Sequence, residues 1–114
     1  ALGIHCKISH GLACALMLPA TLKANYSVRQ QEYAEIYRFL YPEQALSAEQ
    51  AAESLIAEIQ KLNDRIQIPR RLSDVGVSPL QIPALVQSSR GNSMSGNPRE
   101  IPDEELTQIL ESLL

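Results

Sequence analysis

The chain has 114 residues, 45% hydrophobic and 20% charged, a composition typical of one globular domain and unlike that of disordered or fibrous chains. A formal net charge of -3 provides no broad basic field for a phosphate backbone, so we expect no nucleic acid partner. Because no uninterrupted apolar run reaches the roughly 18 residues of a membrane span and no signal peptide is recognisable, we expect a cytoplasmic protein without a membrane partner.

The start of the chain predicts a loop that leads to a histidine. Residues 4–9 lack helical periodicity, and His10 follows them. The two cysteines, Cys6 and Cys14, are too few for a disulfide framework and do not form a CxxC pair. We expect a loop thiol and a small core residue, respectively. Since the chain does not begin with methionine and residues 1–3 resemble the end of an element, we suspect a fragment.

The stretch from Gly11 to Pro19 predicts a helix over residues 10–25. Its side chains are apolar or small around nearly the whole circumference, so we expect it in the middle of a bundle with no face toward solvent. Pro19 removes one backbone hydrogen bond and is expected to kink the helix, and Asn25 is a plausible stop. His10, directly in front, fits either a core histidine with a satisfied hydrogen bond or a ligand to something just outside the helix.

Two amphipathic helices follow, each with a predicted capping box. Ser27 and Gln30 have this spacing at the start of a helix that ends before Pro42, and Ser47 and Gln50 repeat it. Each helix carries one apolar stripe. The first stripe comprises Tyr33, Ile36, Tyr37, Leu40 and Tyr41. The second comprises Ala48, Ala52, Leu55, Ile59, Leu62 and Ile66.

The remainder of the chain predicts shorter elements. Residues 73–77 indicate a turn closed by Gly76, and Ser78 with Pro79 starts a short helix that ends near Gly91. Residues 90–99 form a polar loop, which is either a mobile connector or a functional surface.

The last helix opens at Pro102, where acidic residues of the first turn suit the positive end of the helix dipole. No alternating run of β-branched residues indicates a strand. We therefore predict an all-α fold, an irregular bundle of about five helices.

Several segments of the chain occur in a distinctive order. They are Ala1-Leu2-Gly3, His10-Gly11-Leu12-Ala13 through Leu18-Pro19, Asn25, a capped long helix, Ile68-Pro69 with Leu72, Gly76-Val77, and Gly96-Asn97-Pro98-Arg99 before an acidic helix start. Together they resemble the C-terminal half of iron-containing, group III alcohol dehydrogenases, whose helical domain is of the dehydroquinate synthase-like type. The resemblance covers essentially the whole chain and implies that residues 1–114 are a single helical metal-site domain lacking the N-terminal nucleotide-binding domain.

The resemblance also implies a metal site and a nucleotide site. In that family an N-terminal α/β domain binds NAD or NADP, and one aspartate and three histidines hold a divalent metal in the cleft between the domains. His10 stands at the position of the last histidine, and the other ligands are expected upstream of Ala1. The glycine-rich phosphate loop of the nucleotide domain is missing as well. We therefore expect no catalytic residue in this chain, and the chain alone neither to hold iron nor to transfer hydride.

By resemblance, the full-length enzyme interconverts a primary or small alcohol with its aldehyde or ketone, using iron or zinc as a Lewis acid. A homodimer is a possible assembly. Ser93 and Met94 are expected near the substrate, with an ordinary surface connector as the equal alternative, and His5 is expected as a loop histidine near the cleft. The rival function is a free-standing helical interaction domain, without catalytic activity, whose apolar faces bind a partner peptide.

Overall fold

The structure is a computed structural model that describes residues 1–91 and 94–114 in full and residues 92–93 as backbone only. Across these residues it contains helices and turns and no strand, so the all-α prediction is confirmed. The α-helices are α1 (Leu2–His5), α2 (His10–Ala24), α3 (Tyr26–Leu40), α4 (Ala48–Arg65), α5 (Ile82–Ser88), α6 (Asn92–Ser95) and α7 (Asp103–Ser112). Two 3-10 helices, η1 (Leu72–Val75) and η2 (Pro79–Gln81), lie between α4 and α5.

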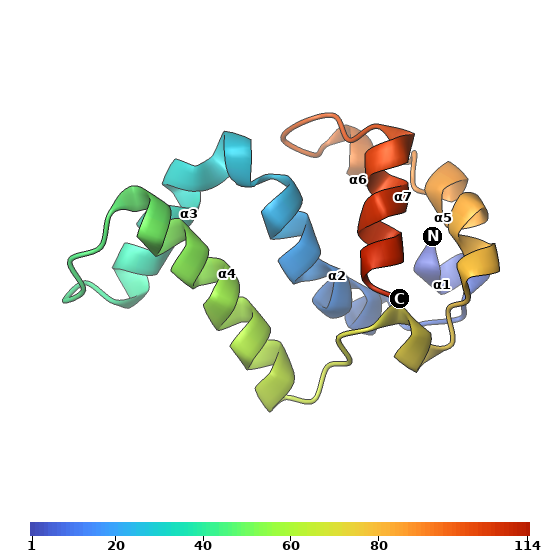
Figure 1. Cartoon of the computed structure of the whole chain (residues 1–114), viewed down its shortest axis with the longest axis horizontal. Coiled ribbons are helices and arrows are strands. Elements are labelled where there is room, and N and C mark those ends of the chain that lie inside the picture. Colours follow the sequence, from blue (N-terminus) through green and yellow to red (C-terminus); the bar gives the residue numbers. More distant parts are fainter.

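Two hydrophobic cores flank α2. The α3–α4 hairpin lies on one side of this helix and α1, α5 and α7 lie on the other (Figure 1). Leu16 of α2 is buried in the core that includes Leu72 and Leu85, and Leu22 packs against the core that includes Tyr33 and Leu55. The molecule is accordingly elongated, measuring 46 × 30 × 21 Å. Helix α2 is the element that joins its two halves.

The predicted burial of α2 on all sides is wrong. Leu16 and Pro19 are its buried residues, whereas one flank is exposed. This flank comprises His10, Cys14, Leu18 and Thr21. These positions recur at intervals of four and three, so they form one stripe along the helix. Apolar side chains around a helix show which of its faces can be buried. They do not show how many other elements of the chain pack against those faces. Cys14, predicted as a small core residue, is exposed for the same reason.

Helix α2 continues through Pro19 because another helix supplies the missing hydrogen bond. Pro19 has no N–H to donate to the Ala15 carbonyl, four residues earlier. The side chain of Asn63 on α4 donates Nδ2 to that oxygen at 2.8 Å. Asn63 is only 6% exposed, so its amide needs this partner as much as the carbonyl does. The bond ties α4 to the middle of α2.

The capping prediction holds for α4 and fails for α3. At the start of α4, the Gln50 N–H donates to Ser47 Oγ at 3.1 Å, and the Ser47 N–H donates to Gln50 Oε1 at 3.2 Å. Helix α3 already begins at Tyr26, so Ser27 lies inside it and caps nothing. Gln30 instead donates its side-chain amide to the Tyr26 hydroxyl at 2.8 Å.

The apolar stripe predicted for α4 extends further than the elements that cover it. Leu55 is buried, whereas Leu62 and Ile66 are 47% and 57% exposed. Figure 1 shows the C-terminal part of α4 extending past α3. The last turns of the stripe are therefore exposed, because the hairpin partner does not reach them.

The C-terminal elements follow the sequence closely. Gly76 ends η1 with φ at 88°, a left-handed conformation that glycine adopts without strain. Pro79 starts η2, and the acidic first turn of α7 follows Pro102.

The N-terminal loop prediction is partly wrong, because residues 4 and 5 belong to the short helix α1.

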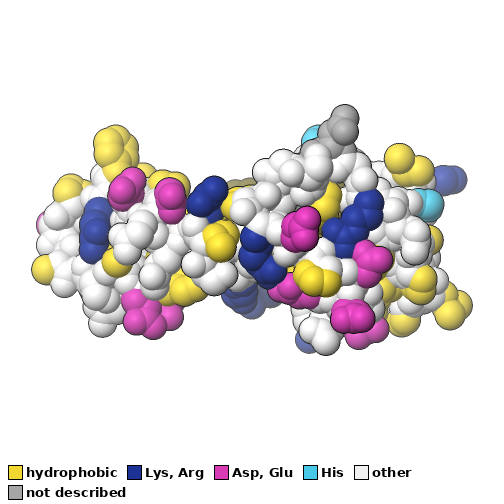
Figure 2. Space-filling model, turned by 90° about the horizontal axis from the view of Figure 1, so that it is seen from above, with side chains coloured by type: hydrophobic (Ala, Val, Ile, Leu, Met, Phe, Trp, Pro, Cys, Tyr) yellow, Lys and Arg dark blue, Asp and Glu magenta, His cyan; other side chains and the backbone are white. Residues whose placement is uncertain are grey.

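The surface carries both signs of charge. On the face seen in Figure 2, acidic and basic side chains are interspersed, and hydrophobic side chains protrude at both ends of the molecule. Three arginines are paired with carboxylates, in the pairs Arg70–Asp64, Arg90–Asp103 and Arg99–Glu105. Within the described residues, no helix is both long enough and apolar enough to cross a lipid bilayer.

Candidate functional site

His10 is the first residue of α2 and lies on its exposed flank. The preceding residue, Ser9, caps the helix, since its Oγ accepts a hydrogen bond from the Leu12 N–H at 3.4 Å. This cap determines where the helix begins and so places the imidazole on the first turn. The exposed ring does not fit the alternative of a histidine enclosed in the core.

One helical turn further on, Cys14 faces the same way. Its Sγ lies 3.5 Å from His10 Nε2, and both side chains are exposed. Residues four apart are neighbours on a helix surface, so this contact follows directly from the helical backbone. The pair was not predicted from the sequence, because the apolar neighbours of Cys14 indicated a position in the core. The signal in the sequence that indicates this pair is the spacing of four residues between His10 and Cys14 inside a predicted helix.

The other predicted site residues lie on other elements. His5 Nε2 is 2.5 Å from Ser88 Oγ, so the histidine joins α1 to the end of α5. Met94 is partly buried and packs against the core that contains Leu16. Ser93 lies outside the residues that the structure describes in full. Of the predicted site residues with described side chains, His10 alone belongs to the exposed flank of α2.

The segment around Asn97 is attached to the opposite end of α2. Asn97 and Asn25 each donate Nδ2 to the other's Oδ1 at 2.8 Å, and Arg99 Nε donates to the Ala24 carbonyl at 2.6 Å. Since α2 has 15 residues, these contacts lie about 20 Å along the helix from His10. The hydrogen bond from Arg99 also holds the pKa of the Glu105 carboxyl below its ordinary value. This network therefore joins α2, the segment 97–99 and α7.

The start of α2 fits a divalent metal as part of a ligand set. An exposed imidazole nitrogen is a common ligand, and a cysteine sulfur lies beside it. Among the residues described, no three His, Cys, Asp or Glu side chains converge on one point. A complete site, with three or four protein ligands, therefore needs donors from beyond these residues.

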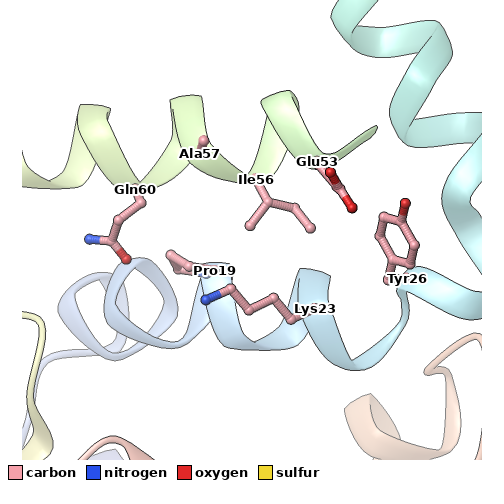
Figure 3. Close-up of a pocket in the computed structure, with 7 residues that line it drawn as sticks. All are labelled: Pro19, Lys23, Tyr26, Glu53, Ile56, Ala57 and Gln60. Atoms are coloured by element: carbon pink, nitrogen blue, oxygen red, sulfur yellow. The ribbon is translucent and has the colours of Figure 1, made fainter. Parts of the chain in front are cut away.

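A groove between α2 and α4 has a different character. It has a volume of about 480 Å³ and lies away from the start of α2. Pro19, Ile56 and Ala57 are its apolar lining, and Figure 3 shows Lys23 of α2 extending along it with Glu53 on the opposite helix. None of the predicted site residues lines this groove.

Comparisons with known proteins agree on one group of enzymes. The model of the Fe-containing alcohol dehydrogenase family, C-terminal, matches residues 1–114. Lactaldehyde reductase of Escherichia coli K12 is 32% identical over 110 residues, which cover 95% of this chain and 29% of the relative. The 1,3-propanediol dehydrogenase of Citrobacter freundii is 33% identical over 103 residues, covering 88% of this chain and 26% of the relative.

A solved structure resembles the fold as well. The crystal structure of a 1,3-propanediol oxidoreductase superposes with a TM-score of 0.91 at 29% identity, covering 99% of this chain and 30% of that one. The chain thus spans less than a third of the length of these relatives.

Proposed function

Since this chain belongs to the Fe-containing alcohol dehydrogenase family and matches its C-terminal part, we propose that the full-length protein is a metal-dependent NAD(P) alcohol dehydrogenase. The proposed reaction interconverts a primary or small alcohol with its aldehyde or ketone. The names of the relatives, a lactaldehyde reductase and a propanediol dehydrogenase, support this substrate class. The comparisons do not favour the rival interaction domain.

Residues 1–114 are, in this proposal, the helical metal-site domain, and an N-terminal domain binds the nucleotide. The family implies a metal and a nicotinamide cofactor. Iron or zinc as the metal, NAD or NADP as the nucleotide, a cytoplasmic location and a homodimer remain predictions.

His10 is the proposed metal ligand, and the observation that supports it is its exposed Nε2 on the first turn of α2. A bound divalent metal supplies Lewis acidity toward the alcohol or carbonyl oxygen. The chain's own contribution is orientation. Ser9 fixes the start of the helix, and Asn63 holds the turn that contains Ala15. The imidazole is thus presented from a helix fixed at its first turn and in its middle.

Ser93, Met94 and His5 remain the predicted neighbours of the substrate. For His5 the structure adds a specific partner, Ser88. Met94 packs its side chain against the core that contains Leu16. We therefore propose that Met94 affects the substrate pocket by shaping its wall.

The test uses the full-length protein with His10→Ala. We expect the metal content and the rate of NAD(P)-dependent alcohol oxidation to fall together, the rate by at least about 100-fold, because a direct ligand matters more than its supporting partners. His5→Ala is the control for metal content and is expected to retain the metal. Normal metal content in His10→Ala would remove His10 from the site. A metal-loaded wild-type protein that oxidises no alcohol would overturn the proposed function.

A further inference from the structure

We propose that an exposed apolar surface shared by α2 and α4 is covered, in the full-length protein, by the segment that supplies the remaining metal ligands. This apolar surface consists of Leu18 of α2 with Leu62 and Ile66 of α4, which are 40%, 47% and 57% exposed. The inference rests on the proposed function, because that function requires ligands from outside residues 1–114. It goes further by assigning the surface on which the segment that carries them packs.

On α4, the apolar residues lie on one side of the contact with α2 and the groove lies on the other. Asn63 donates to the Ala15 carbonyl of α2 at 2.8 Å and so marks the line of contact. Because successive helix residues turn by about 100°, Gln60 and Ile66 lie about 60° from Asn63 in opposite directions. Gln60 lines the groove shown in Figure 3, so Ile66, with Leu62 one turn before it, faces away from that groove.

Helix α2 has the same division. Pro19 lines the groove and lies about 40° around the helix from Ala15, whereas Leu18 lies about 60° away in the opposite direction. Leu18 belongs to the exposed flank that also carries His10, which is about 12 Å away along the helix axis. The exposed flank of α2 and the uncovered end of α4 therefore border the same side of the contact between the two helices.

The described elements of this chain leave the apolar surface open. Helix α3 does not reach the C-terminal part of α4, and α1, α5 and α7 pack on a different face of α2 (Figure 1). A leucine or isoleucine exposed singly is normal, but three of them grouped on two adjoining helices are typical of an interaction surface. Burial of these three side chains therefore requires residues from outside the described chain.

The position of His10 identifies what covers the apolar surface. A complete metal site has three or four protein ligands, and each nitrogen or oxygen donor lies about 2.0–2.2 Å from the same ion. The segment that carries the other ligands must therefore lie directly against the exposed flank of α2, which the apolar surface adjoins. The relatives have enough chain for such a segment, because residues 1–114 correspond to less than a third of each. The segment presents apolar side chains to Leu18, Leu62 and Ile66, since burial of apolar groups against one another is favourable.

The experiment replaces Leu62 of the full-length protein with the photoreactive residue p-benzoylphenylalanine and identifies the crosslinked peptides by mass spectrometry. We expect a crosslink within one molecule, to a peptide from outside residues 1–114. The matched control carries the same photoreactive residue in place of Leu80, which is 91% exposed on η2, and is expected to give no such crosslink. Replacing an aspartate or histidine of the crosslinked peptide, or of the peptides adjoining it, by alanine is expected to lower the metal content.

A second measurement needs no variant, in case the substitution of Leu62 prevents folding. In carbene footprinting of the wild-type full-length protein, we expect Leu62 and Ile66 to be labelled at least about tenfold less than Leu80, because a covered side chain reacts only when the structure opens locally. A crosslink only to a second molecule, which doubles the mass, or equal labelling of Leu62 and Leu80, overturns the inference and leaves the proposed function standing. A wild-type protein that binds no divalent metal overturns both.

Discussion

Asn63 is a buried polar residue whose role is set by a proline on another helix. Its amide donates to the Ala15 carbonyl, which Pro19 deprives of a helical partner. A buried carbonyl or amide without a partner costs more than a hydrogen bond gains, so the three residues form one unit. This unit allows a proline in the middle of α2 without a break in the helix.

The free energy of unfolding should reveal this dependence. Asn63→Ala is expected to lower it by about 1–3 kcal/mol, because the Ala15 carbonyl loses its partner. In combination with Pro19→Ala the loss should be smaller, since an alanine at position 19 supplies the backbone N–H again. Chemical denaturation of the wild type, the two single variants and the double variant measures the coupling between the two positions. Glu53→Ala, an exposed change on the same helix, is the control and should shift stability by less than about 0.5 kcal/mol. Strictly additive losses would contradict this account.

The helices show which local signals determine an element and which do not. The capping box of α4 formed as predicted because Ser47 and Gln50 are the nearest partners for each other's backbone N–H groups. The same spacing at Ser27 and Gln30 failed, because α3 follows α2 with a single intervening residue, Asn25, and begins too early for Ser27 to cap it. A capping pattern thus predicts a helix start only where the preceding chain is free to end there.

The two serines form a matched pair for a stability test. Ser47→Ala is expected to destabilise the protein by about 1 kcal/mol, the usual cost of a lost N-cap. Ser27→Ala should change stability by less than about 0.5 kcal/mol, because the Ser27 side chain is exposed in the first turn of α3 and makes no capping hydrogen bond. Thermal unfolding followed by circular dichroism compares the two. Equal losses from both variants would mean that Ser27 has a capping role after all.

At the scale of the whole molecule, helix positions were predictable and exposure was not. The limits of α2, the start of α4 and the glycine turn at Gly76 follow from periodicity, caps and backbone freedom, which are local. The exposed flank of α2 and the uncovered end of α4 depend on which elements pack beside them, and no local pattern carries that information. The same reason explains the site. The resemblance pointed to His10, whereas Cys14 was missed because an apolar surrounding sequence suggested a core residue.

The contact between Arg99 and Glu105 makes the stability of the folded chain sensitive to acid. The hydrogen bond from Arg99 lowers the pKa of the Glu105 carboxyl in the folded chain. The contact therefore stabilises the fold fully above the ordinary glutamate pKa of about 4.3 and is lost as the pH falls through the lower folded value. Glu105→Gln is expected to reduce the dependence of the unfolding midpoint on pH below about 4.5. Glu104→Gln is the exposed neighbouring control, and an identical pH profile for the two variants would contradict the assignment.

Helix α2 is held at two separate points, by Asn63 in its middle and by Asn97 just beyond its last turn. A helix attached at one point can still rotate about that point, whereas attachment at two points fixes the direction of its axis. The orientation of the His10 imidazole on the first turn therefore depends on Asn63 and Asn97, which are far from it in the sequence. Replacing either asparagine is expected to change the orientation of His10, although neither contacts it.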